Sequence, residues 1–203
     1  MIKGYLGVDV GSVSTNLVVI DDQNQLLVEQ YLRTNGKPIQ TVQEGLHAIG
    51  QDLPADVQIA GAATTGSARY LTSLIIGADI VKNEITAHAI ASSALAEDVK
   101  TIIEIGGQDS KIIILREGVV TDFAMNTVCA AGTGSFLDQQ ASRLLISIED
   151  FGSYALKAKN PAILTGRCAV FAESDMVHKQ QLGYNTEDII AGLCEALVRN
   201  YMN

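Results

Sequence analysis

The sequence GVDVGSVSTNLVVI, from Gly7 to Ile20, reads as an apolar strand, a short turn and a second apolar strand. The first strand carries the carboxylate of Asp9 at its end, and Gly11 opens the turn. A tight turn needs glycine where φ is positive or where backbones approach closely, and without a Cβ the backbone N–H groups can face an anion. The neighbouring carboxylate can hold Mg²⁺ through water or orient an attacking water. This hairpin is therefore a candidate phosphate-binding site.

The same pattern recurs in EIGGQDSKIIIL, from Glu104 to Leu115. Both segments read as an acid, an apolar residue, glycine, a small residue, two variable positions, a hydroxyl, a polar residue and an apolar run. A glycine turn is also common in hairpins that bind no ligand, but two matched copies favour the phosphate interpretation. Two such turns facing each other would clamp the phosphates of a nucleotide. The sequence has no G-x-x-x-x-G-K-[ST] motif, which excludes a P-loop.

Hydrophobic periodicity predicts a strand meander followed by helices in each half of the chain. The expected strands cover residues 4–10, 15–20, 26–33, 57–62, 101–105, 111–116 and 119–125. The expected helices cover residues 39–53, 68–76, 84–96, 134–145, 149–159, 169–182 and 186–203.

The composition fits one large domain or two small ones. Of the 203 residues, 47% are hydrophobic and 18% are charged, which allows a substantial core and excludes disorder and a coiled coil. The net charge is -9 and Lys and Arg form no cluster, so we expect no nucleic-acid partner. The apolar run from Leu6 to Ile20 is interrupted by polar residues and falls short of the ~20 residues of a membrane span. We therefore expect no membrane partner and a cytoplasmic location.

Four segments carry a specific resemblance to known proteins. They are GVDVGS at residues 7–12, NEITAHA at 83–89, EIGGQDSK at 104–111 and NTVCAAGTG at 126–134. Together they resemble the ATPase superfamily of actin, sugar kinases and heat-shock chaperones. Within it, the chain is similar to the activators of 2-hydroxyacyl-CoA dehydratases, which share a family with the ATPase subunits of benzoyl-CoA reductases. The likeness runs over nearly the whole chain.

This resemblance implies an α/β chain with the actin-like, ribonuclease H-like ATPase fold, in which a β-meander followed by helices is duplicated. We expect a first subdomain at residues 1–100 with the first phosphate motif. A second subdomain is expected at residues 101–203 with the second motif and the cluster cysteines. Family members continue with a strand, a glycine-rich adenosine motif and a closing helix. We therefore expect this second subdomain to be truncated, which leaves the adenosine contacts unassigned.

The resemblance also implies an ATP-dependent one-electron activator of a 2-hydroxyacyl-CoA dehydratase-like iron-sulfur protein. The expected cofactors are ATP or ADP, Mg²⁺ and one four-iron four-sulfur (4Fe-4S) cluster per homodimer, and the expected electron donor is a ferredoxin or flavodoxin. Asp9 would organise Mg²⁺, and Glu104 or Gln108 would orient the attacking water. The expected phosphate contacts come from both turns: Gly11, Ser12, Ser14, Thr15, Gly106, Gly107 and Gln108.

The three cysteines, Cys129, Cys168 and Cys194, are widely spaced, which argues against a disulfide framework and leaves metal binding, catalysis or packing. Cys129 and Cys168 each precede an expected helix, whose N-terminal dipole would lower the thiol pKa. On spacing alone, core packing is the better interpretation. The resemblance instead assigns Cys129 and Cys168 as cluster ligands, shared by two chains about a two-fold axis. Cys194 lies on an apolar helix face and is expected to pack.

Two other functions remain open. A kinase of the sugar-kinase type would use an aspartate as base and release a phosphorylated product, whereas a nucleotide-binding regulatory module would bind ATP without hydrolysing it. Lys111 either reaches a phosphate or is simply the polar residue of an alternating strand. Glu104 stands where relatives commonly carry aspartate, and its extra methylene displaces the carboxylate.

Overall fold

The computed structural model describes residues 1–126, 130–165 and 168–202. The chain divides into two compact units. Residues 1–102 and 114–121 form the first unit, and residues 103–113 and 122–203 form the second. Each unit is described by itself.

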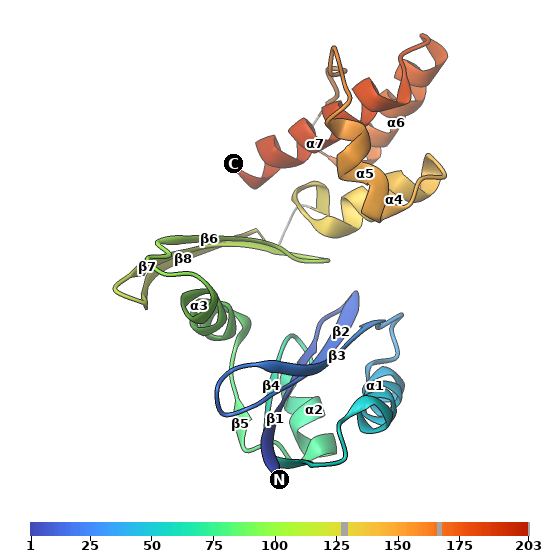
Figure 1. The fold of residues 1–203 in the computed structure, drawn as a ribbon. Helices are drawn as coiled ribbons and strands as arrows, with labels where there is room; N and C mark the ends of the chain where they lie inside the picture. The colour runs from blue at the N-terminus through green and yellow to red at the C-terminus, as the bar shows by residue number, and fades with distance from the viewer. Residues whose placement is uncertain (127–129, 166–167, 203) are drawn as a thin grey trace. The chain divides into compact units, whose positions relative to one another are not determined.

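The first unit is built on a five-stranded sheet with the strand order β3-β2-β1-β4-β5 (Figure 1). β1, β2 and β3 form an antiparallel meander, and β4 pairs with β1 in parallel. β5 then pairs with β4, also in parallel. The strands are β1 Ile2–Val10, β2 Ser14–Ile20, β3 Leu26–Arg33, β4 Val57–Thr65 and β5 Ile80–Val81.

Three helices accompany this sheet: α1 Pro38–Asp52, α2 Arg69–Ile76 and α3 Glu84–Leu95. Alternate residues of β1 and β2 point into the core, where Val10 and Leu17 are fully buried. Val42 of α1 belongs to the same apolar cluster. Pro38 starts α1, where the missing N–H group costs no helical hydrogen bond. Burial of these alternating side chains fixes the register of β1 on β2, because a slip of one residue would expose them.

A three-stranded sheet of order β6-β7-β8 follows, and its strands contribute residues to both units. The strands are β6 Thr101–Ile105, β7 Ser110–Arg116 and β8 Val119–Asn126. The remaining elements of the second unit are the 3₁₀ helix η1 Ala130–Gly132 and the helices α4 Gly134–Arg143, α5 Ile148–Ala155, α6 Ala169–Gln181 and α7 Thr186–Tyr201.

α7 is the central helix of the second unit and packs against α5, α6 and η1. Ile190 and Leu193 on its apolar face are fully buried with Phe136 of α4, Phe151 of α5 and Met176 of α6. Asn185 caps α7 by accepting a hydrogen bond from the backbone N–H of Asp188. Among the described helices, none is long and apolar enough to cross a bilayer.

The strands and helices expected from periodicity are confirmed, with differences at their ends. α4 stops at Arg143 because Leu145 adopts a positive φ of 57°. α5 ends at Ala155, four residues earlier than its apolar spacing predicts, and the chain continues in tight turns toward Pro161. The two-residue strand β5 and the short helix η1 were not predicted, because elements of two or three residues are too short to show a hydrophobic period.

Candidate functional site

The first glycine turn joins β1 to β2 and is held by the backbone. The amide of Gly11 donates to the carbonyl of Ser14 over 2.9 Å. Asp9 lies opposite Asn16 in the antiparallel register, directly before the turn. Ser12 is exposed at the turn, and Ser14 Oγ accepts a 3.5 Å hydrogen bond from the side-chain amide of Asn16. The turn therefore places a carboxylate and two hydroxyls, all expected from the sequence, at one end of the sheet.

A buried pair of hydroxyls supports this turn from the β3 side. Thr15 Oγ1 lies 2.9 Å from Thr34 Oγ1, and both side chains are buried. Thr34 Oγ1 also donates to the carbonyl of Gly11 over 3.0 Å, and its amide donates to the carbonyl of Val13. Thr15 thus holds the turn from inside the unit, and Thr34 is a supporting residue that the sequence pattern did not reveal.

Gly66 brings a second chain segment against the first turn. β4 runs parallel to β1 with Thr65 opposite Asp9, and Gly66 follows with a φ of 90°. A Cβ at Gly66 would collide with Asp9 Oδ1 and would lie 2.5 Å from the carbonyl oxygen of Val10. The amide of Ala68 donates to that same carbonyl over 3.0 Å. The ends of β1 and β4 therefore converge on the carboxylate of Asp9.

The second glycine turn, between β6 and β7, contains an ionic cluster. The ammonium of Lys111 donates to Glu104 Oε2 over 3.0 Å and to Asp109 Oδ1 over 2.7 Å. A Cβ at Gly106 would lie 2.8 Å from Glu104 Oε1, so glycine lets this carboxylate lie against the turn without being displaced. Burial by itself would lower the pKa of Lys111, but the hydrogen bonds to Asp109 and Glu104 outweigh it and raise the pKa. Lys111 is therefore a charged ammonium.

The N-terminus of α4 is bonded to the second turn. The amide of Gly134 donates to the carbonyl of Gly106 over 2.8 Å, and the amide of Ser135 donates to the carbonyl of Gly107 over 3.2 Å. A Cβ at Gly134 would lie 3.2 Å from the carbonyl oxygen of Gly106, so glycine permits this approach. Gln108 is exposed in the turn. The second turn thus groups Glu104, Gly106, Gly107 and Gln108 as the sequence predicts.

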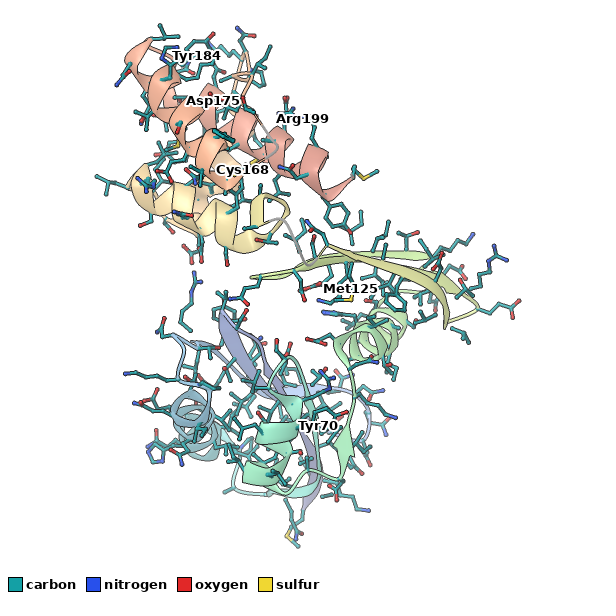
Figure 2. The ribbon with its side chains drawn as sticks, turned by 180° about the vertical axis from the view of Figure 1, so that it is seen from behind. Tyr70, Met125, Cys168, Asp175, Tyr184 and Arg199 are labelled. Atoms are coloured by element: carbon teal, nitrogen blue, oxygen red, sulfur yellow. The ribbon has the colours of Figure 1, made fainter. Side chains whose placement is uncertain are left out.

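Cys168 is the N-cap residue of α6, as expected. Its thiol is free and half-buried, and no side-chain hydrogen bond caps the helix. Asp175, further along α6, accepts a 2.7 Å hydrogen bond from the amide of Thr165, which lies just before Cys168 in sequence (Figure 2). Hydrogen bonds from the side chain of Thr165 and from its backbone amide hold the pKa of Asp175 below its ordinary value. Arg199 of α7 donates to the carbonyl of Leu164 over 3.0 Å.

The other two cysteines differ from Cys168. Cys129 lies outside the described residues. Cys194 packs against the apolar cluster of the second unit, and burial raises the pKa of its thiol. Its packing role is confirmed. Within the parts of the chain that the structure describes, no three His, Cys, Asp or Glu side chains group as a metal site.

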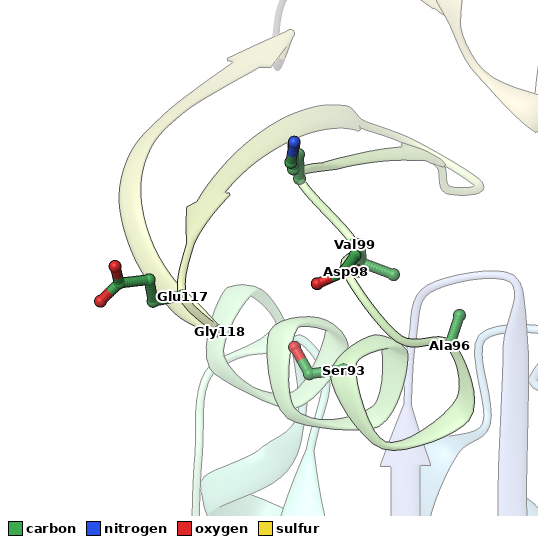
Figure 3. A pocket seen from close by; sticks show the side chains of 7 residues that line it. Ser93, Ala96, Asp98, Val99, Glu117 and Gly118 are labelled. Carbon is green, nitrogen blue, oxygen red and sulfur yellow. The ribbon is translucent and has the colours of Figure 1, made fainter.

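A pocket of about 340 Å³ is lined by residues of the first unit alone (Figure 3). Ser93 of α3 lines it together with Glu117 and Gly118 from the turn between β7 and β8. This turn is at the opposite end of β7 from Asp109. The pocket therefore contains none of the residues that the sequence assigns to phosphate.

Comparisons with known proteins identify the family of this chain. Residues 6–203 match the model of the BadF/BadG/BcrA/BcrD ATPase family. The chain is 34% identical to the (R)-2-hydroxyglutaryl-CoA dehydratase activating ATPase of Acidaminococcus fermentans, over 93% of this chain and 72% of that protein. The crystal structure of that dehydratase component A superimposes with a TM-score of 0.83 and 31% identity over 98% of this chain and 76% of that one.

A second solved structure is similar over the same extent. The activator of 2-hydroxyisocaproyl-CoA dehydratase from Clostridium difficile, with bound ADPNP, gives a TM-score of 0.87 and 29% identity over 98% of this chain and 74% of that one. These likenesses confirm the expected actin-like ATPase fold. The chain therefore belongs to the BadF/BadG/BcrA/BcrD ATPase family.

Proposed function

We propose that this chain is an ATP-dependent activator that passes one electron to an iron-sulfur protein of the 2-hydroxyacyl-CoA dehydratase type. Its family and its similarity to two dehydratase activators support this role. The ADPNP bound to the Clostridium difficile activator supports a nucleoside triphosphate as the ligand of this chain.

In this proposal, both glycine turns contact the phosphates of one ATP. Asp9 holds Mg²⁺, usually through water because this ion keeps most of its hydration shell. The hydroxyls of Ser12 and Ser14 and the N–H groups next to Gly11 contact phosphate oxygens, and Thr15 supports them through Thr34. An anion-binding turn next to a carboxylate that can hold Mg²⁺ suits the binding of a nucleotide's phosphates.

The second turn supplies the remaining contacts. The N–H groups of Gly106 and Gly107 face phosphate, while Glu104 or Gln108 orients the attacking water. Lys111 binds Glu104 Oε2, and Oε1 of the same carboxylate lies over Gly106. The carboxylate is therefore held in one orientation next to the proposed phosphate position.

The proposed 4Fe-4S cluster takes Cys129 and Cys168 from each of two identical chains. The residues around Cys168 fit this group, because its free, half-buried thiol stands at the N-cap of α6, and cysteine is the usual ligand of such clusters. When bound, the cluster would supply one electron to the partner, and a donor such as a ferredoxin or flavodoxin would restore it. Asp175 and Arg199 hold the backbone of Thr165 and Leu164 in the second unit.

One observation carries the link between nucleotide and helices: the hydrogen bonds from Gly134 and Ser135 to the second turn. A ligand shifts a conformational equilibrium only when it binds the two states unequally. Phosphates that bind the Gly106–Gly107 backbone in one conformation therefore bias the N-terminus of α4. This helix directly follows the segment that contains Cys129.

The test uses anaerobically purified, reconstituted chain with a 2-hydroxyacyl-CoA dehydratase, a reductant and ATP. We expect dehydratase activity that requires ATP hydrolysis and is lost in Cys168→Ser but kept in Cys194→Ser. ATP hydrolysis without activation of any dehydratase tested would contradict the electron-transfer role. Phosphorylation of a small molecule in place of activation would indicate a kinase.

A further inference from the structure

Lys111 is an unusual residue for the first positions of a strand, because its side chain is only 3% exposed. Burying an ammonium costs several kcal/mol unless it is paired and hydrogen-bonded. Two carboxylates provide this pairing, from Glu104 on β6 and Asp109 at the end of the turn. The ammonium therefore bridges both sides of the glycine turn.

The backbone of Lys111 is also anchored. Tyr201, at the end of α7, donates its hydroxyl to the carbonyl of Lys111 over 2.6 Å. Burial, and after it the charge of Glu104, raises the pKa of Tyr201, so this hydroxyl remains a donor at neutral pH. Main chain and side chain of Lys111 are thus both held, which gives the ammonium little freedom to leave the carboxylates.

The first hairpin has no such charge at the matching positions. Asn16 stands where the second hairpin has Lys111, and Ser14 stands where it has Asp109. Asn16 makes a long 3.5 Å hydrogen bond to Ser14. The repeat therefore preserves the acidic residue and the glycine turn but places a buried cation in the second copy. This difference points to separate tasks for Asp9 and Glu104.

From this geometry we propose that Lys111 is a positioning residue for ATP hydrolysis: its ammonium binds Glu104 Oε2 and aims Oε1 of that carboxylate across Gly106. Lys111 acts through Glu104 and the turn, and its ammonium does not contact the nucleotide. Lys111 is therefore more than the polar residue of an alternating strand. This inference rests on the proposed function, since it assigns a task within ATP hydrolysis.

The kinetic test compares Lys111→Met with Lys82→Met, which removes an exposed ammonium from the first unit. We expect Lys111→Met to lower kcat for ATP by about 10- to 100-fold, the effect of misplacing a catalytic group, with KM changed by less than about 2-fold. In a Glu104→Gln background, Lys111→Met should change kcat by less than about 2-fold, because the group it positions is already neutral. Lys82→Met should match wild type.

A second readout does not depend on hydrolysis. In two-dimensional amide NMR spectra without nucleotide, the Gly106 and Gly107 signals should move in Lys111→Met and stay in place in Lys82→Met. Thermal unfolding and the spectrum of the remaining amides show whether each variant folds, and Lys111→Arg, which keeps the charge, provides a second variant whose glycine signals should move less.

Three results would overturn the inference: unmoved glycine signals in Lys111→Met, a kcat loss that persists undiminished beside Glu104→Gln, or a loss confined to KM. The last result would mean that the ammonium contacts the nucleotide directly. If the wild-type chain binds ATP but never hydrolyses it, the proposed function fails, and the NMR comparison alone then decides whether Lys111 holds the turn.

Discussion

The backbone amide of Gly134 donates a 2.8 Å hydrogen bond to the carbonyl oxygen of Gly106. This bond joins the start of α4 to the second glycine turn, and it uses an N–H group that a helix N-terminus would otherwise leave without a partner. The turn and the start of α4 are therefore joined directly through their backbones. Neither residue carries a side chain, which is why the two backbones can approach so closely.

Gly66→Ala should abolish the support that β4 gives to the first turn. A Cβ at this position collides with Asp9 Oδ1 and crowds Val10, and the φ of 90° adds backbone strain. Gly36→Ala is the matched control, since its φ is 71° but no atom lies within 4 Å of the added Cβ. We expect Gly36→Ala to cost about 1–2 kcal/mol of unfolding free energy from strain alone.

Urea unfolding of both variants measures this free energy. Gly66→Ala should lower the free energy of unfolding clearly more than Gly36→Ala does. It should also weaken nucleotide binding, measured by calorimetry. Equal losses in the two variants would show that the convergence of β1 and β4 on Asp9 is unimportant.

Asp9→Asn should reduce kcat for ATP hydrolysis by at least about 100-fold, because a bound metal contributes several kcal/mol to phosphoryl transfer. The substitution preserves shape and removes the charge that Mg²⁺ needs. Asp22→Asn, at an exposed position of the following turn, controls for a change of net charge. Steady-state phosphate release at several Mg²⁺ concentrations measures the effect. Wild-type rates in Asp9→Asn would rule out this carboxylate as the metal ligand.

Two glycines of α1 provide a packing test within one helix. A Cβ at Gly45 would collide with Leu17, a fully buried residue of β2, whereas nothing lies within 4 Å of a Cβ at Gly50. Gly45→Ala should therefore destabilise the fold by about 1–3 kcal/mol through overpacking. Gly50→Ala should instead stabilise it by up to about 1 kcal/mol, because alanine is the better helix former. Thermal unfolding followed by circular dichroism distinguishes the two, and equal shifts in Tm would contradict the packing of α1 on β2.

The hydrogen bond from Thr165 to Asp175 predicts a pH dependence of stability. The pKa of Asp175 is lower in the folded chain than its ordinary value of 3.8. Its contribution is therefore fully present above pH 3.8 and is lost as the pH falls through the folded pKa. Asp175→Asn should lower Tm at neutral pH and lose part of the decline of Tm on acidification. Asp56→Asn, an exposed carboxylate near β4, should leave that decline unchanged. An identical decline in wild type and Asp175→Asn would exclude this bond as a source of stability.

The sequence predicted both glycine hairpins because their chemistry is local. Asp9, Gly11, Glu104 and Gly106 lie within a few residues of each turn, so their order along the chain already determines their proximity. Cys168 at the start of α6 was equally local, since apolar spacing indicates where a helix begins.

Residues contributed by distant segments were missed. Gly66 reaches Asp9 only because β4 pairs with β1 in parallel after the intervening helix α1. Its place directly after two β-branched residues, Thr64 and Thr65, is the signal that could have indicated a strand end with a close approach. Thr34 and Tyr201 support the turns through tertiary contacts that periodicity does not encode. The role of Lys111 was missed for the same reason. Alternation predicts which face of the strand carries its side chain, but it does not reveal the hydrogen bonds to Glu104 and Asp109.

The iron and acid-labile sulfide content of the anaerobically reconstituted protein shows whether two chains share one 4Fe-4S cluster. We expect about four iron and about four sulfide atoms per two chains, because one cubane needs four thiolates and each chain offers two. Cys129→Ser and Cys168→Ser should each lose most of the iron, while Cys194→Ser, in the packed core, should keep it. A wild-type chain that holds no iron after reconstitution, or a Cys168→Ser chain that holds as much as wild type, would exclude a cluster shared through Cys168.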